Sequence, residues 1–230
     1  MQKPQYDIIK PFLIEKKDKK ILELGAGGNC YEYFKKISKD YVGIDIIKGN
    51  WEMPKKFMTQ DLEKNTKLPF PDNTFDVVIA MDVLEHLTFR EEILKELSRV
   101  AKDNCVFAIT LPNEFSYQPV WYHIKGVNWI SGNRTKWVDG KEYLTDQLSN
   151  DGHKYFYDIH QAKTYIKKEL DIIKIHYAYM DGKLQFLGKL NQWLANKYPR
   201  WFARNMIFIC TKKGLTSSLD GLGGEWENKL

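Results

Sequence analysis

The residues with the clearest chemical potential lie in a glycine-rich turn, "GAGGN" at 25–29, which follows the apolar run "ILEL" at 21–24. Glycines at such a turn let backbone N–H groups approach a ligand closely. Asp45 follows about twenty residues later, at the end of a second apolar run, where a carboxylate accepts hydrogen bonds from two ribose hydroxyls. This spacing predicts a site for a ligand that contains a nucleoside.

Three further residues narrow the choice of ligand. The dinucleotide pattern G-x-G-x-x-G needs a glycine at position 30, and Cys30 occupies it. Glu23 lies just before the turn, where its carboxylate would repel a pyrophosphate but suits a cationic amino-acid group. Asp61 lies at the end of a short third strand expected near 57–62 and is placed to accept from an exocyclic adenine amine. These details disfavour a pyrophosphate cofactor.

Short apolar runs alternate with charged, amphipathic segments along most of the chain. This alternation predicts βαβ units with right-handed crossovers, and therefore a parallel sheet covered by helices on both faces. Strands are expected at 21–24, 41–46, 57–62, 75–81, 105–111, 171–180 and 205–213, and helices at 6–16, 31–38, 90–102, 158–170 and within 184–203 up to about Pro199.

Four stretches carry a family resemblance: "ILELGAGGN", "YVGIDI", "TQDLEKNTKLPFPDNTFDVVIAMDVLEHL" and "ITLPN". They resemble the motifs of class I S-adenosylmethionine-dependent methyltransferases, especially the type 11 group. The resemblance is strongest over 20–113 and returns at 158–213. It implies an α/β, Rossmann-like sandwich with a seven-stranded, mostly parallel sheet. Its last strand would run antiparallel and insert beside the fifth.

The resemblance also implies the cofactor, S-adenosyl-L-methionine, with S-adenosyl-L-homocysteine as its product. One group of residues would hold the amino-acid end, one acid the ribose, and two short segments the adenine. The residues that would contact the amino-acid end are Glu23, Gly25, Ala26, Gly27, Met81, Asp82 and Val83. Asp45 would bind the ribose, and Ile46, Asp61 and Leu62 would contact the adenine. Asn29 departs from the family pattern of a third glycine, but Asn tolerates left-handed backbone angles, so binding is expected to survive.

The methyl acceptor is less visible in the sequence. Transfer from a sulfonium needs chiefly positioning and the exclusion of water, so it leaves few catalytic residues to find. "AMDVLEH" lacks the Asn/Asp-Pro-Pro-aromatic element of nucleic-acid amine methylases. No cysteine lies directly after the fourth strand for pyrimidine C5 methylation, although Cys105 opens the fifth. We therefore expect transfer to O or N of a small molecule, saccharide or natural product. A non-catalytic binding module is the alternative, and an RNA methyltransferase is less favoured.

Three histidines are candidates for the acceptor side. His86, in "LEHL", is the first candidate for a general base, although a structural role beside the cofactor loop is favoured. His153 is a second candidate base, and His160 is a candidate for orienting the substrate. No third ligand with suitable spacing accompanies them, so no metal site is expected.

We expect one domain over 1–213, with 113–157 as an insertion or lid over the acceptor site, and a loose Gly- and Ser-rich tail at 214–230. Trp121 and Trp137 in the insertion could stack on an acceptor ring or sugar. A small hydrophobic core or a homodimer contact explains these aromatic residues equally well.

The composition, with 43% hydrophobic and 28% charged residues, is ordinary for a soluble globular protein. The net charge of +5 is spread along the chain, so it indicates no DNA partner and gives RNA no special support. Three scattered cysteines, no leader and no long apolar run indicate a cytoplasmic protein with reduced thiols. For the amphipathic segment 184–203, a helix that covers the sheet is favoured over peripheral membrane contact.

Overall fold

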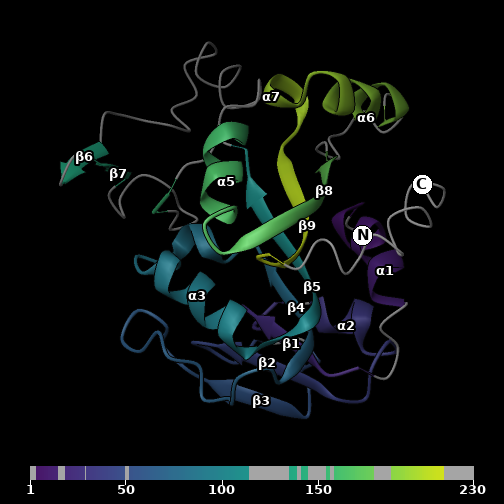
Figure 1. Ribbon diagram of the computed structural model, residues 1–230. Helices are drawn as coiled ribbons and strands as arrows, with labels where there is room; N and C mark the ends of the chain where they lie inside the picture. The colour runs from purple at the N-terminus through teal and green to yellow at the C-terminus, as the bar shows by residue number, and fades with distance from the viewer. Residues whose placement is uncertain are drawn as a thin grey trace.

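The computed structural model describes residues 4–14, 19–28, 30–49, 52–113, 135–138, 141–144, 154–155, 158–178 and 188–214. Within them, seven strands form one sheet in the order β3-β2-β1-β4-β5-β9-β8 (Figure 1). The strands are β1 (Ile21–Leu24), β2 (Tyr41–Asp45), β3 (Lys56–Thr59), β4 (Phe75–Met81), β5 (Ala101–Pro112), β8 (Leu170–Ala178) and β9 (Asn205–Lys212). The helices are α1 (Pro4–Ile14), α2 (Cys30–Phe34), α3 (Arg90–Val100), α5 (Ile159–Ile166), α6 (Gly188–Lys197) and α7 (Pro199–Phe202), with a 3₁₀ helix η1 (Leu84–His86).

Strand directions confirm the expected fold class. The strands from β3 to β5 pair in parallel, whereas β9 is antiparallel to both of its neighbours, β5 and β8. The last strand therefore inserts beside the fifth, as the family resemblance implied. The protein is a Rossmann-like α/β sandwich with a seven-stranded, mostly parallel sheet.

The two central strands are buried along their length, which explains their continuous apolar sequences. All four residues of β1 are buried, and so are six of the seven residues of β4. Parallel strands covered on both faces have this character, because neither face meets water. Their bounds agree with the sequence prediction for the same reason.

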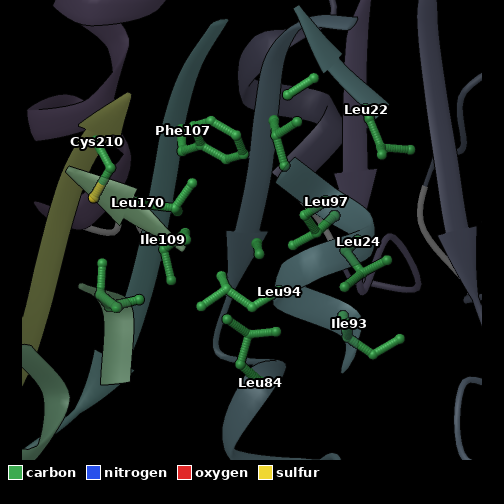
Figure 2. Close-up of a cluster of buried hydrophobic side chains, with 14 of the residues drawn as sticks. Leu22, Leu24, Leu84, Ile93, Leu94, Leu97, Phe107, Ile109, Leu170 and Cys210 are labelled. Carbon is green, nitrogen blue, oxygen red and sulfur yellow. The ribbon is translucent and has the colours of Figure 1, made fainter. Parts of the chain in front are cut away.

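Helices cover both faces of the sheet (Figure 1). On one face, α3 and α5 pack onto the larger core, to which α3 contributes Ile93, Leu94, Leu97 and Val100. That spacing places all four side chains on one side of a helix. Figure 2 shows Leu94 and Leu97 beside strand residues such as Leu24. On the other face, α1 and α2 pack onto a second core that includes Ile9 and Phe34.

Several element boundaries differ from the sequence prediction, among them the ends of β3 at Thr59 and of α5 at Ile166. Two of the differences have a local cause. Helix α2 ends at Phe34 because the chain then tightens, and the Ile37 N–H donates to the Phe34 carbonyl three residues back. Strand β5 begins at Ala101, earlier than expected. Its register with β4 shifts between Phe75 and Val77, an irregularity of strand pairing that sequence periodicity does not reveal.

The insertion contains a hairpin that the sequence analysis missed. Strands β6 (Thr135–Val138) and β7 (Lys141–Leu144) pair antiparallel, with Trp137 opposite Glu142. The signal for it was the dipeptide Asp139-Gly140, which is typical of two-residue hairpin loops. Trp121 lies outside the described residues, as does the tail beyond Gly214.

Candidate functional site

The glycine turn lies at the carboxyl edge of the sheet, where the strand order reverses. Strand β1 is central, and both β2 and β4 run parallel to it on either side. Ligands of open α/β sheets bind at such a switch point, because the loops diverge there and leave a crevice. The turn is held to β2, since the N–H groups of Gly25 and Ala26 donate to the Ile44 carbonyl at 2.9 and 3.0 Å.

Two features favour glycine at position 25: its backbone angle and the close approach of Val83. The φ of Gly25 is 76°, in the left-handed region that side chains disfavour. A Cβ atom at this position would lie 3.0 Å from the Cβ of Val83, in the loop after β4. The first turn and the β4 loop are thus in close contact, and a larger residue would separate them.

Asp45 is oriented by the same turn. The Gly27 N–H donates to Asp45 Oδ2 at 2.7 Å, and the Ile47 N–H donates to Asp45 Oδ1 at 3.2 Å. A Cβ atom on Gly27 would lie 2.8 Å from Asp45 Oδ2, so the absence of a side chain lets the backbone reach the carboxylate. The carboxylate is half-buried at the end of β2, in the position predicted for a ribose acceptor.

Glu23 is a buried acid directly before the turn. Its exposed fraction is 2%, and the Tyr41 hydroxyl donates to Glu23 Oε2 at 2.9 Å. Burial raises the pKa of Glu23 to about 7, although the hydrogen bond from Tyr41 acts in the opposite direction. No cationic side chain forms an ion pair with Glu23 among the described residues, so the carboxylate is suited to a cationic ligand.

The residues predicted for the adenine side follow β2 and β3. Ile46 and Ile47 are both large apolar side chains left exposed, at 55% and 65%, next to Asp45. The sequence analysis named Ile46 and missed Ile47. Asp61 pairs with Lys64 at 3.1 Å, and the hydrogen bond from Lys64 lowers the pKa of Asp61. Leu62, also predicted for the adenine side, is buried and belongs to the larger core.

The loop after β4 begins with a strained residue. Asp82 has φ 51°, which is uncommon for any residue but glycine. Its N–H donates to Thr110 Oγ1 at 2.8 Å, and Thr110 Oγ1 donates in turn to Asp82 Oδ1 at 2.7 Å. Thr110 is fully buried on β5, opposite Met81 in β4. This reciprocal pair fixes the loop that the resemblance assigned to the methionine arm.

The candidate histidines are placed differently. His86 lies half-buried in η1, where its N–H donates to the Val83 carbonyl at 3.1 Å, so it follows the cofactor loop directly. His160 is exposed in the first turn of α5. His153 lies outside the described residues, as does Asn29. His86 is thus the described histidine that directly follows the β4 loop, and the roles of all three histidines remain predictions.

Two aromatic residues at the site were missed by the sequence analysis. Tyr41 is the hydrogen-bond partner of Glu23, and Tyr6 reaches the same region from α1. Burial raises the pKa of Tyr6 above its usual range, and the nearby carboxyl groups of Glu23 and Asp82 add to the effect. No local pattern could have found Tyr6, because the contact depends on how α1 packs on the sheet.

The described residues also bear on a metal site and on a membrane span. In the described part of the chain, no group of three or more His, Cys, Asp and Glu side chains is arranged to hold a metal ion. None of the described helices combines the length and the apolar character needed to cross a membrane.

Part of this chain is similar in sequence to known methyltransferases. Residues 22–109 match the family described as "Methyltransferase domain". A ubiquinone biosynthesis O-methyltransferase of Pelagibacter ubique is 31% identical over 120 residues, which cover 47% of this chain and 50% of that protein. A ubiquinone/menaquinone biosynthesis C-methyltransferase of Burkholderia mallei is 34% identical over 91 residues, covering 36% of this chain and 35% of that protein.

A solved structure extends the likeness to nearly the whole chain. The crystal structure of a SAM-dependent methyltransferase from Archaeoglobus fulgidus superposes with a TM-score of 0.56, covering 90% of this chain and 92% of that one at 18% identity. At that identity the likeness shows the fold. The chain spans half or less of the length of the two curated relatives above.

Proposed function

Because the chain carries a class I methyltransferase domain of the type 11 group, whose cofactor is S-adenosylmethionine, we propose that the protein transfers a methyl group from this cofactor to a small-molecule acceptor. The acceptor atom is an oxygen or a nitrogen, on a small molecule, a saccharide or a natural product. The support comes from the cofactor side of the site, and above all from the buried acid before the glycine turn.

The residues present fit the cofactor. Glu23 supplies a buried carboxylate without a cationic partner among the described residues, which suits the α-ammonium group of an amino acid. Gly27 has no side chain to block the approach to Asp45, whose carboxylate suits two ribose hydroxyls. The exposed side chains of Ile46 and Ile47 offer an apolar surface to a purine.

The chain's own contribution to the reaction is mainly positional. When bound, S-adenosylmethionine supplies an electrophilic methyl group on a sulfonium. Glu23 and the loop from Met81 to Val83 hold the amino-acid end, so the methyl group has a fixed place relative to the acceptor. If the acceptor is a hydroxyl, His86 is the candidate to take its proton, because it follows that loop in η1.

The acceptor proposal rests on the sequence. Trp121, His153 and most of the insertion lie outside the described residues, and His160 is exposed. The names of the curated relatives include both an O-methyltransferase and a C-methyltransferase. An acceptor screen should therefore include phenols, hydroxylated sugars and amines first, with activated ring carbons as the contrasting class.

The experiment is calorimetric titration of the purified protein with S-adenosylmethionine and S-adenosylhomocysteine. The variant Asp45→Ala removes the predicted ribose acceptor at the end of β2. The matched control is Asp40→Ala, just before β2, where the carboxylate is partly exposed and pairs with Lys56 at 2.7 Å. We expect binding to both ligands that is lost in Asp45→Ala and retained in Asp40→Ala. Absence of binding by the unaltered protein would contradict the proposal.

A non-catalytic binding module is the alternative function. It predicts the same titration result but no methyl transfer to any acceptor in the screen. Single-turnover transfer from a methyl-labelled cofactor separates the two, because an enzyme releases S-adenosylhomocysteine only when a suitable acceptor is present. Transfer to one acceptor class supports the enzyme and excludes the module.

A further inference from the structure

Asp82 is held by residues that lie outside the matched stretch 22–109. Gln5 in α1 donates from Nε2 to Asp82 Oδ2 at 3.3 Å, and Asn205, the first residue of β9, donates from Nδ2 to Asp82 Oδ1 at 3.3 Å. Asn205 Nδ2 also donates to Gln5 Oε1 at 3.1 Å. Segments from the two ends of the described chain therefore meet at one carboxylate.

This cluster surrounds a backbone conformation that needs support. The left-handed φ of Asp82 is unfavourable, and such a conformation persists only where several contacts determine it together. Thr110 fixes the Asp82 N–H and one carboxylate oxygen from β5. Gln5 and Asn205 then complete the coordination of both oxygens from two other elements.

The position of Asp82 controls the contact with the glycine turn. Val83 is the next residue, and its side chain fills the space where a Cβ atom on Gly25 would be, with Val83 Cβ and Cγ2 at 3.0 and 3.1 Å. A shift of Asp82 would therefore move Val83 against or away from the turn. Tyr6, next to Gln5, is close enough to Asp82 and Glu23 for both to affect the pKa of its hydroxyl.

These contacts are not needed to attach α1 to the sheet. Four large side chains of α1 are already buried in the second core: Tyr6, Ile9, Phe12 and Leu13. Gln5 is the buried polar side chain of the same helix, at 9% exposure. Removing its hydrogen bonds should therefore leave the helix packed and act locally, on Asp82 and the β4 loop.

We propose that Gln5 and Asn205 are positioning residues for the cofactor: they hold Asp82, and through it Val83, against Gly25 in the arrangement that binds the amino-acid end. The proposal rests on the proposed function. It extends the cofactor site to α1 and β9, beyond the segment that defines the methyltransferase domain by sequence.

The test compares Gln5→Met, which keeps the side-chain length without donors, and Asn205→Leu with Asp82→Gly. Glycine at position 82 tolerates the left-handed angle but has no carboxylate to hold. Calorimetry gives Kd for S-adenosylmethionine and S-adenosylhomocysteine well below the melting temperature of each variant. We expect each single change at Gln5 or Asn205 to raise both Kd values about fivefold, the range of one or two net hydrogen bonds.

The decisive result is the behaviour of the double variants. If Gln5 and Asn205 act through Asp82, neither change should raise Kd further in the Asp82→Gly background. A role confined to stability would instead lower the melting temperature and leave Kd unchanged. Lys10→Ala, an exposed change in the same helix, is the control and should alter neither quantity.

The outcomes separate the two proposals. Unchanged Kd in Gln5→Met and Asn205→Leu, or full additivity with Asp82→Gly, overturns the positioning role while the proposed function stands. Failure of the unaltered protein to bind either ligand overturns the proposed function, and this inference with it.

Discussion

At the scale of single residues, two neighbouring glycines in the first turn differ in whether a side chain would fit: Gly27 has no room for one, and Gly28 does. A Cβ atom on Gly27 would lie 2.8 Å from Asp45 Oδ2 and 3.1 Å from the Ile47 carbonyl oxygen, whereas one on Gly28 meets nothing within 4 Å. We predict that Gly27→Ala displaces the Asp45 carboxylate and weakens cofactor binding by about tenfold or more, with a loss of about 1–3 kcal/mol in the free energy of unfolding.

Gly28→Ala is the matched control for that change, since it adds the same methyl group one residue along the turn. It should leave Kd unchanged and alter stability by no more than about 1 kcal/mol. Titration calorimetry and chemical denaturation measure the two quantities. Equal losses of affinity in both variants would show that the close approach of Gly27 to Asp45 does not matter for binding.

Glu23 connects the site to the pH dependence of stability. Its pKa is raised from 4.5 to about 7, chiefly by burial, so the folded protein binds a proton that the unfolded chain has already released. The stabilising contribution of the protonated form is complete below about pH 4.5 and is lost as the pH rises through about 7. The full shift corresponds to about 3 kcal/mol.

We predict that Glu23→Gln removes the loss of folding stability at rising pH, because the amide stays neutral and its oxygen still accepts a hydrogen bond from Tyr41. Tyr6 and Tyr41 also face Glu23, but their raised pKa values keep both hydroxyls protonated over this range. In the ligand-free protein, the variant should gain stability over the unaltered protein between pH 5 and 8, while cofactor affinity falls. Urea denaturation across that range is the measurement, and a difference independent of pH would contradict the assignment.

At the scale of elements, α5 begins with a capping box formed by Asp158 and Gln161. The Gln161 N–H donates to Asp158 Oδ1 at 2.7 Å, and the Asp158 N–H donates to Gln161 Oε1 at 3.1 Å. We predict that Asp158→Ala lowers the free energy of unfolding by about 1 kcal/mol. Thermal unfolding should show it as a decrease of about 2–4 °C in melting temperature.

His160→Ala is the companion variant, because this exposed residue lies in the same first turn. It should leave the melting temperature unchanged, so any loss of turnover in it would report on the acceptor side rather than on the helix. Comparable destabilisation by His160→Ala and Asp158→Ala would mean that the capping box contributes little.

The elements that sequence analysis placed well are those with strong local signals. Strands β1 and β4 are continuous apolar runs because both of their faces are buried, and α3 carries its apolar residues at helical spacing. The early start of β5 depends on a shift in strand register, and the short α2 on a tightened turn, and neither follows from composition. These boundaries could not be predicted locally.

In the site too, local sequence signals could be predicted, whereas contacts between distant segments could not. The glycine turn, Glu23 and Asp45 lie within about 25 residues of one another, and their order along the chain identified them. Gln5 and Asn205 are separated by 200 positions and meet at Asp82 only after β9 inserts beside β5. A contact of that kind follows from topology. The sequence motifs could therefore identify Asp82 but not its partners Gln5 and Asn205.

At the scale of the whole molecule, charge distribution bears on the less favoured RNA function. The net charge is +5, and several basic side chains of the described residues form ion pairs with acids, such as Lys56 with Asp40, Lys168 with Glu91 and Lys102 with Asp76. An RNA methyltransferase needs a connected basic surface that follows the phosphates. The Lys and Arg residues are spread along the sequence rather than gathered in one block, which does not favour such a surface.

We therefore predict weak, unsaturated RNA binding at about 150 mM salt, and cofactor binding that changes little between about 50 and 200 mM salt. Fluorescence anisotropy with a labelled single-stranded and a hairpin RNA measures the first quantity, and calorimetry measures the second. Nonspecific contacts, if present, should disappear steeply with salt because they depend on released counterions. Saturable micromolar RNA binding that persists at the higher salt concentration would favour the RNA function over a small-molecule acceptor.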